Sequence, residues 1–272
     1  MMISHRSIQN FVLVNGSVLL IGSAFYFIEQ LNPFLILFLM IIKNYITLEG
    51  INPKNNSKLV LPAREFFKST CIDTLSYCII RSNFTYPTTS ISYDILYFIP
   101  VSFAYELIFD FFYYWAHRKL HMNLYLYKTI HATHHHHAIT SVYTTFHHSL
   151  LDLMITNTIP LILASSFIHV SSYTFVLLFC YKNIAEIAGH SGVDKKTPSF
   201  VQCIWLPKIL GIELYTKNHC LHHEMPTVNF SKRFSIWDKV FGTFNPRMPN
   251  QMSNKNGKTP EITYDDTSVS RI

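Results

Sequence analysis

The chain has 272 residues, of which 49% are apolar, 15% are aromatic and only 14% are charged. Soluble domains carry about 25% charged residues, so this composition favours a membrane protein. The formal net charge of +6 is spread without a dense Lys/Arg stripe. Basic loops beside an anionic leaflet therefore explain it better than nucleic-acid binding does.

Two apolar segments open the chain. Residues 11–28 are long enough to cross a bilayer, and no small-residue cleavage site follows them, so we expect a retained anchor rather than a signal peptide. After Asn32 and Pro33, residues 34–42 begin a second apolar helix. Residues 1–48 are therefore predicted to form membrane-anchor helices.

The next segment, residues 49–94, is mixed and polar, and it is predicted to be a cytoplasmic or interfacial linker. Two glycosylation sequons, at Asn55 and Asn83, would place it on the opposite side of the membrane. The sequence leaves the orientation of this segment open.

Residues 95–245 contain the remaining apolar segments and almost all the histidines. Residues 95–115 lead directly into "AHRKLH", and residues 150–188, broken near Pro160 and around residues 169–172, predict a helical hairpin. The expected fold is thus all-α, an integral membrane bundle of about four transmembrane helices with a histidine-rich cap. Residues 246–272 are polar, lack apolar periodicity and are predicted to be a disordered tail.

The histidines form spaced motifs. Of the 15 in the chain, 14 lie between His117 and His223. One HxxxH pair and two HxxHH clusters contain eight of them: His117 and His121; His131, His134 and His135; His219, His222 and His223. Positions i, i+3 and i+4 share one helix face, so the imidazoles of each motif converge. Eight nitrogen ligands are too many for one metal and suit two metals with open positions.

Ligand type alone does not decide which metal is bound, because imidazole suits zinc, copper, iron and nickel. A structural zinc site closes with four ligands, so the larger set favours a dinuclear centre. A lone HxxxH pair is more often structural than ligating, but three such motifs in one chain predict a metal site.

Further candidates flank the motifs. His190, in "GHSG", is expected to be a ninth ligand, and either His147 or His148 is a possible extra one. Asp110 shares a helix face with His117. It is expected either to accept the second ring N–H of a ligand histidine or to pair with Arg118 or another base.

The residues resemble a known family. The blocks "DFFYYWAHRKLH" (110–121), "LYKTIHATHH" (126–135), "GHSG" (189–192) and "NHCLHHEMPTVNFSKRFSIWDKVFGTF" (218–244) are similar to those of the fatty acid hydroxylase superfamily. This superfamily includes sterol desaturases, 4-methyl sterol oxidases and cholesterol hydroxylases. Its members often carry His-Pro where this chain has His147 and His148, which leaves the extra ligand open.

The resemblance implies that residues 95–245 form a catalytic domain in which nine histidines hold two irons. It also implies O2 as co-substrate, electrons from cytochrome b5 or an NAD(P)H-dependent reductase, and residence in the endoplasmic reticulum with the metal site facing the cytosol. The implied ligands are His117, His121, His131, His134, His135, His190, His219, His222 and His223.

The expected activity is hydroxylation or desaturation of a lipid, with a sterol as the first candidate substrate and a fatty-acyl or ceramide chain as the alternative. A histidine-rich metal transporter belongs to another class of function. It is disfavoured because transporters need ligands on several spanning helices, whereas nearly all these histidines lie outside the apolar segments.

Overall fold

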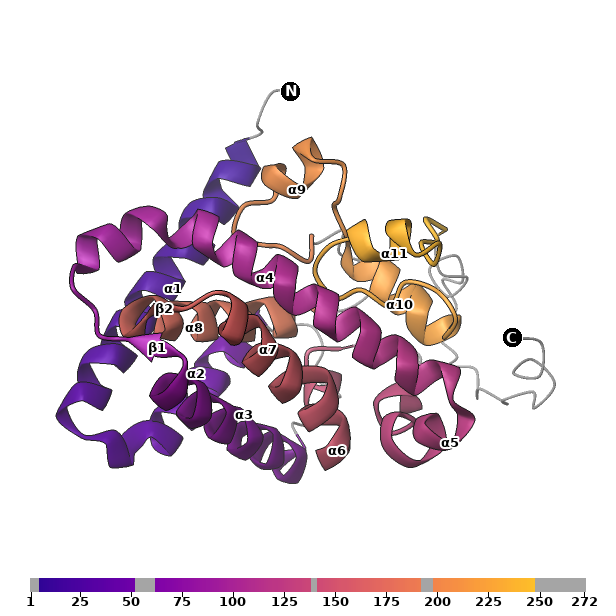
Figure 1. Ribbon diagram of the computed structural model, residues 1–272, viewed down its shortest axis with the longest axis horizontal. Coiled ribbons are helices and arrows are strands. Elements are labelled where there is room, and N and C mark those ends of the chain that lie inside the picture. Colours follow the sequence, from indigo (N-terminus) through magenta and orange to yellow (C-terminus); the bar gives the residue numbers. More distant parts are fainter. Residues whose placement is uncertain (1–4, 52–61, 138–140, 192–197, 248–272) are drawn as a thin grey trace.

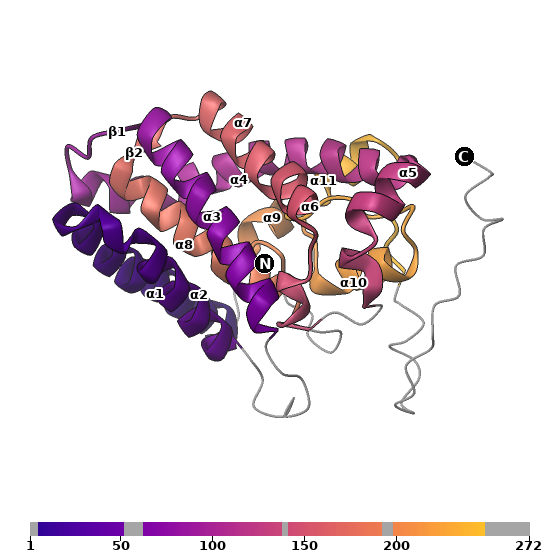
Figure 2. The same cartoon turned by 90° about the horizontal axis from the view of Figure 1, so that it is seen from below.

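The computed structural model of the protein describes residues 5–51, 62–137, 141–191 and 198–247. These residues form a helical bundle with one short two-stranded sheet (Figures 1 and 2). The all-α prediction is confirmed. The predicted disordered tail, residues 246–272, lies almost entirely outside the described residues.

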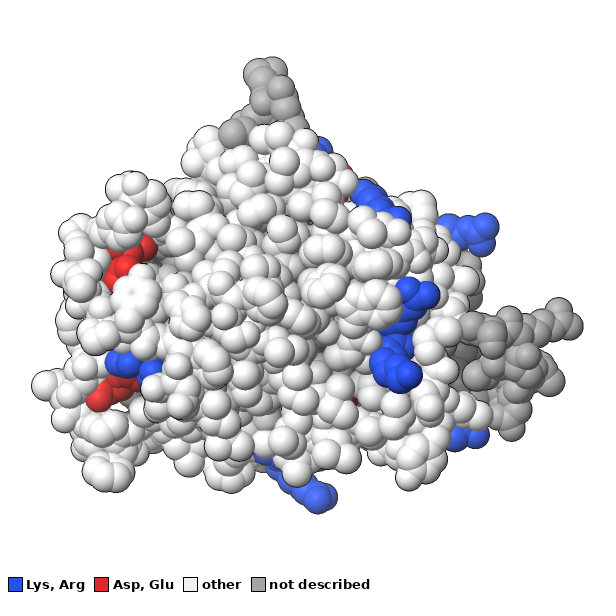
Figure 3. Space-filling model, viewed as in Figure 1, with Lys and Arg blue, Asp and Glu red and all other residues white. Residues whose placement is uncertain are grey.

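Four helical segments are long and apolar enough to cross a membrane, as predicted. They are α1 (His5–Leu31); η1 (Pro33–Leu35) with α2 (Ile36–Ile51); α4 (Ile91–Met122); and the continuous helix of α6 (Leu150–Leu153), η5 (Met154–Thr158) and α7 (Ile159–Phe167). In Figure 3 the middle of one face carries no acidic or basic side chain. Exposed apolar side chains such as Leu20, Leu96 and Phe167 fit a lipid-facing surface.

Helix α8 (Ser172–Gly189) is the centre of the bundle. It contacts α1, α2, α3 and α4, and nearly all its side chains are buried. The turn before it contains β2 (Val170–Ser171), which pairs in parallel with β1 (Thr85–Tyr86). This pairing holds the turn between α7 and α8 at the end of the bundle far from α10 (Figure 1).

The segment predicted to be a polar linker, residues 49–94, contains a packed helix. Residues 52–61 lie outside the described part, but α3 (Ala63–Asn83) is a helix that packs against α2, α6 and α8. Its buried face alternates Phe66, Tyr77 and Ile80 with small hydroxyl residues such as Ser69 and Thr70. The hydroxyl groups lower the average hydropathy of the segment, although their small side chains allow close helix packing.

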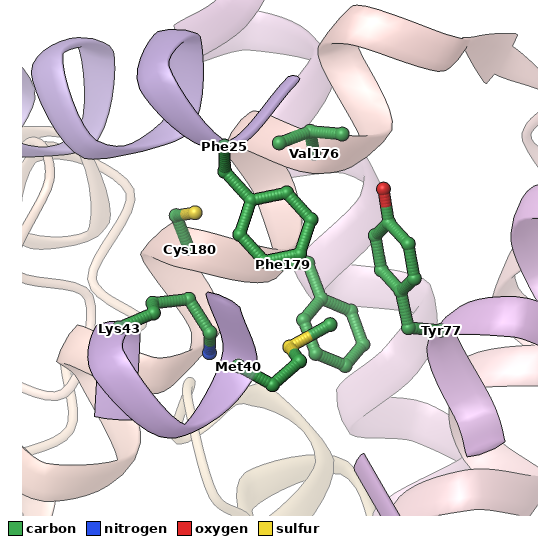
Figure 4. Close-up of a pocket in the computed structure, with 7 residues that line it drawn as sticks. All are labelled: Phe25, Met40, Lys43, Tyr77, Val176, Phe179 and Cys180. Atoms are coloured by element: carbon green, nitrogen blue, oxygen red, sulfur yellow. The ribbon is translucent and has the colours of Figure 1, made fainter. Parts of the chain in front are cut away.

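A buried lysine lies where α1, α2 and α3 meet α8 (Figure 4). The Lys43 ammonium is 5.3 Å from the centre of the Phe179 ring, and it has no hydrogen-bond partner among the described residues. The surrounding slot leaves no room for a water molecule. The face of the aromatic ring is therefore the partner that offsets part of the cost of this buried charge.

Helices α1 and α8 approach closely at Gly22. A β-carbon added there would lie 2.6 Å from Cδ2 of Leu177, whereas one added at Gly16 would meet nothing within 4 Å. We expect Gly22→Leu to lower the free energy of unfolding by about 1–3 kcal/mol because it overpacks this contact. Chemical denaturation in detergent tests this, with Gly16→Leu as the matched control; equal effects of the two substitutions would contradict it.

Candidate metal centre

The end of the bundle opposite the sheet carries the histidines. A helix of 32 residues such as α4 is about 48 Å long, against about 30 Å for a bilayer core, so its last turn, with His117 and His121, can extend beyond the hydrocarbon. Next come α5 (Leu124–Leu126), the π-helical turn η2 (Tyr127–His131), η3 (His134–His136) and η4 (Thr144–Phe146). The remaining elements are α9 (Trp205–Ile209), α10 (Thr216–Glu224) and α11 (Ile236–Val240).

All nine histidines predicted as ligands come together in two groups, and within each group one ring nitrogen per residue lies within 4.8 Å of the others. Group 1 contains His117, His121, His131, His135 and His222, and group 2 contains His134, His190, His219 and His223.

Each HxxHH motif contributes to both groups, contrary to the expectation that all three imidazoles of a motif would converge. His131 and His135 belong to group 1, whereas His134 belongs to group 2. In the first motif His131 ends a π-helical turn and His134 begins a separate 3-10 turn. The second motif divides within the single helix α10, where His222 faces His121 on α4 and His219 faces His190.

In group 1 the ring nitrogens face one another. The Nε2 atom of His117 lies 3.1 Å from that of His131 and 3.2 Å from that of His121, and the Nε2 atoms of His121 and His222 are 3.1 Å apart. Two nitrogens that are each about 2.1 Å from one ion are separated by about 3.0–3.4 Å at coordination angles of about 90–110°. These distances fit shared coordination of one ion.

Group 2 repeats this geometry. The Nε2 atom of His219 lies 3.2 Å from that of His190 and 3.1 Å from that of His223. The Nδ1 atom of His190 donates to the backbone oxygen of Glu186, one turn earlier on α8.

The loop after α10 determines which ring nitrogen carries the proton. Nδ1 of His117 donates to the carbonyl of Phe230, and Nδ1 of His222 donates to the carbonyl of Val228, both at 2.8 Å. Because a carbonyl only accepts, the proton is on Nδ1 and the Nε2 lone pair is free. Lone pairs that face each other at such distances repel unless a cation lies between them, so the donor set fits a metal ion.

Burial keeps several of these imidazoles uncharged. Desolvation lowers the pKa of His222 to about 3 and that of His190 to about 4, and it holds the pKa of His134 well below its usual value. These three rings are therefore neutral at physiological pH, which is the protonation state that metal ligation requires.

Asp110 accepts from the loop after α10, rather than from a histidine ring or from the Arg118 side chain. Its carboxylate accepts the backbone N–H groups of Lys232, Arg233 and Phe234, at 2.7–3.0 Å. It acts on the centre indirectly, because it holds the loop whose carbonyls orient His117 and His222.

Buried ion pairs fix the same loop. Arg233 donates to Glu106 on α4 at 2.7 Å and to Glu186 on α8 at 2.8 Å, and Lys232 pairs with the second oxygen of Glu186. The Arg233 side chain is 1% exposed. The loop is thus attached to two helices of the membrane bundle.

Asp152 contacts the histidines directly. One carboxylate oxygen accepts from Nδ1 of His131 at 2.8 Å, and the other accepts from Nδ1 of His148 at 2.6 Å. His148 stacks on His134 but belongs to neither group, and His147 lies against His136 and His137 instead. Neither His147 nor His148 therefore lies where it would be an extra ligand.

The sequence around both histidine groups matches a known family. The profile of the family described as "Fatty acid hydroxylase" matches residues 102–243, which is more than half of the chain. The chain belongs to the fatty acid hydroxylase family. The match begins on α4 and ends after α11, so it includes both histidine groups.

Curated relatives in this family act on different lipids. The chain is similar to the fatty acid hydroxylase vlmA of a Lecanicillium species (31% identity, covering 51% of this chain and 40% of the relative). It is also similar to sphinganine C4-monooxygenase 2 of Arabidopsis thaliana (28%; 57% and 58%) and to human lathosterol oxidase (29%; 50% and 42%). The chain spans about half the length of the curated relatives it matches. No solved structure matches it.

The role of Asp152 in this fatty acid hydroxylase family member gives a testable prediction. Asparagine offers one acceptor oxygen where two ring N–H groups need one each, so Asp152→Asn is expected to weaken metal binding by about 10–100-fold. Competition between the purified protein and a chelator for zinc measures this affinity. Asp94→Asn is the control, because Asp94 accepts from Ser171 at the far end of the bundle. Equal affinities of the two variants would contradict a role of Asp152 in orienting His131.

Proposed function

We propose that the protein is a membrane-bound non-haem di-iron oxidoreductase that uses O2 to hydroxylate or desaturate a lipid. The observation that carries the proposal is the pair of groups of mostly buried imidazoles whose Nε2 lone pairs face one another. Group 1 would hold one iron and group 2 the other, with the nine histidines as ligands. Bound iron would supply the activation of O2 and the attack on an unactivated C–H bond.

The chain's own residues orient the imidazoles and exclude water from the metal centre. The carbonyls of Val228 and Phe230 and the carboxylate of Asp152 orient the imidazoles through their Nδ1 protons. Most of the ligands are buried, so water is largely excluded from the centre.

A sterol is the first candidate substrate, and human lathosterol oxidase supports it as a relative. A fatty-acyl or ceramide-type chain is the second candidate, because the fatty acid hydroxylase and the sphinganine monooxygenase match this chain with similar identity. Both substrate classes fit an apolar membrane domain.

We place the protein in the endoplasmic reticulum, with the metal centre facing the cytosol and receiving electrons from cytochrome b5 or an NAD(P)H-dependent reductase. Exposed basic residues near the metal end support this orientation, because cytoplasmic segments beside membrane helices are rich in Lys and Arg. They include Lys119, Lys128, Lys239 and Arg247. Figure 3 shows basic side chains gathered on the side of α5, α10 and α11.

The test is mass spectrometry of lipids from sterol-producing cells that express the wild type or His222→Ala. We expect a sterol that gains oxygen or loses two hydrogens only with the wild type. Hydroxylated acyl chains with an unchanged sterol pool would move the protein to the second substrate class. Metal uptake without any product that depends on O2 and a reductant would instead favour a metal transporter.

A further inference from the structure

A small polar cavity lies beside the metal centre, among α3, η4, η5, α8 and the loop after α10. Its volume is about 40 Å³. One water needs about 10–15 Å³ measured in this way, so the cavity has room for a few water molecules.

Three polar atoms of the cavity lining have no hydrogen-bond partner among the described residues: Oδ1 of Asn157, Nδ2 of Asn183 and Oγ1 of Thr145. Both asparagines are 6% exposed. An unsatisfied buried polar group costs about 1–3 kcal/mol, and three of them around one cavity indicate that water supplies the missing partners.

Charged side chains form the rest of the wall. Lys182 lies 3.5 Å from Asp73, which also accepts from Asn157 at 3.0 Å, and Lys232 pairs with Glu186. Such residues are expensive inside a membrane bundle and usually mark the path of an ion, a proton or a substrate.

The cavity reaches the histidine groups at His148. This ring lines the cavity and stacks on His134 of group 2, with ring centres 4.2 Å apart. Lys182 and Glu186 lie one turn apart on α8, and His190, which caps the end of this helix, lies one turn beyond Glu186, so the polar wall leads toward group 2.

The proposed chemistry needs such a path. Hydroxylation follows RH + O2 + 2e⁻ + 2H⁺ → ROH + H2O: the C–H bond is broken, one oxygen atom forms the new C–O–H group and the other is reduced to water. Desaturation also takes up two electrons and two protons per O2, and it forms an alkene and two waters. The reductase supplies the electrons, but the protons must reach a buried centre.

We propose that this cavity holds ordered water and is the inlet through which protons reach the metal centre, with Asn157 and Asn183 as positioning residues for that water. The inference rests on the oxygenase function proposed above. Protons pass along hydrogen-bonded water, and Asp73 and Lys182 remain an ion pair that keeps the cavity polar.

The first measurement is independent of turnover. A high-resolution structure of the zinc-loaded wild type is expected to show water hydrogen-bonded to Nδ2 of Asn183. An empty cavity, or one filled by the polar group of a lipid, would overturn the proposal.

The second measurement compares Asn183→Leu with Asn44→Leu, which makes the same change at a fully buried asparagine that does not line the cavity. We expect Asn183→Leu to keep its iron but to form about tenfold less product per O2 consumed, with release of hydrogen peroxide and a larger solvent deuterium isotope effect. Asn44→Leu is expected to stay coupled. If Asn183→Leu does not fold, Thr145→Val removes another unpartnered atom of the lining with little change in shape.

These outcomes separate the two proposals. A wild type that forms no oxidised lipid with O2 and reductant contradicts the oxygenase function, and the water structure then still tests the cavity. An active wild type with equal coupling in both asparagine variants contradicts the inlet alone.

Discussion

Replacing His117 with alanine is expected to reduce bound iron from two ions to about one per chain and to lower product formation by at least about 100-fold. His117 belongs only to group 1, where its Nε2 atom lies 3.1–3.2 Å from those of two other ligands. Loss of residues that merely orient ligands already costs about 10–100-fold in metal affinity or activity, so loss of a ligand costs more. His219→Ala is expected to have the same effect on group 2.

The measurement is iron per chain in purified protein, by elemental analysis beside a lipid-oxidation assay. The double variant should lose both ions, because the two substitutions act on separate groups. His169→Ala is the control, since this histidine is exposed in the turn between α7 and β2. Two irons in His117→Ala would refute the assignment of group 1.

The second large effect is expected at Arg233. Arg233→Ala leaves the carboxylates of Glu106 and Glu186 without their guanidinium partner, and removal of one member of a buried ion pair costs about 3–5 kcal/mol. The loss should also reach the metal, because the released loop orients His117 and His222. We expect a lower denaturation midpoint in detergent and weaker retention of iron.

Arg247→Ala serves as the control, because Arg247 is exposed. A variant with Glu106→Gln and Arg233→Met together should be more stable than Arg233→Ala alone, since one unpaired charge is removed. If Arg233→Ala unfolds at the wild-type midpoint, the ion pairs do not hold the loop.

The convergence of the nine histidines could be predicted from sequence because the motifs are dense and the spacing of i, i+3 and i+4 is a local property of helices. The division of the motifs between two groups could not. For the first motif the division depends on the π turn that ends at His131, and neither the composition nor the periodicity of residues 127–131 distinguishes that turn from an α-helical one. For the second motif it depends on which distant histidine faces each side of α10, His121 or His190, and spacing along one helix does not give that.

The sequence pattern also does not identify hydrogen-bond partners that are far apart along the chain. Spacing along α4 placed Asp110 on the same face as His117, but a shared face does not identify the partner. The partners of Asp110 lie 122–124 residues further along the chain. The carboxylate that does contact a ligand histidine, Asp152, is 21 residues from His131 and lies on a different helix.

The π turn η2 limits how chains of this kind can change in length. A π turn holds one residue more than an α-helical turn, so deleting any one residue of Tyr127–His131 would convert η2 into ordinary helix. Everything after the deletion would rotate by about 100° relative to α4. The number of residues between His121 and His131, which is nine, therefore cannot change without moving His131 relative to His121. An otherwise similar chain that is one residue shorter there must either lack the turn or build its centre from a different set of nitrogens.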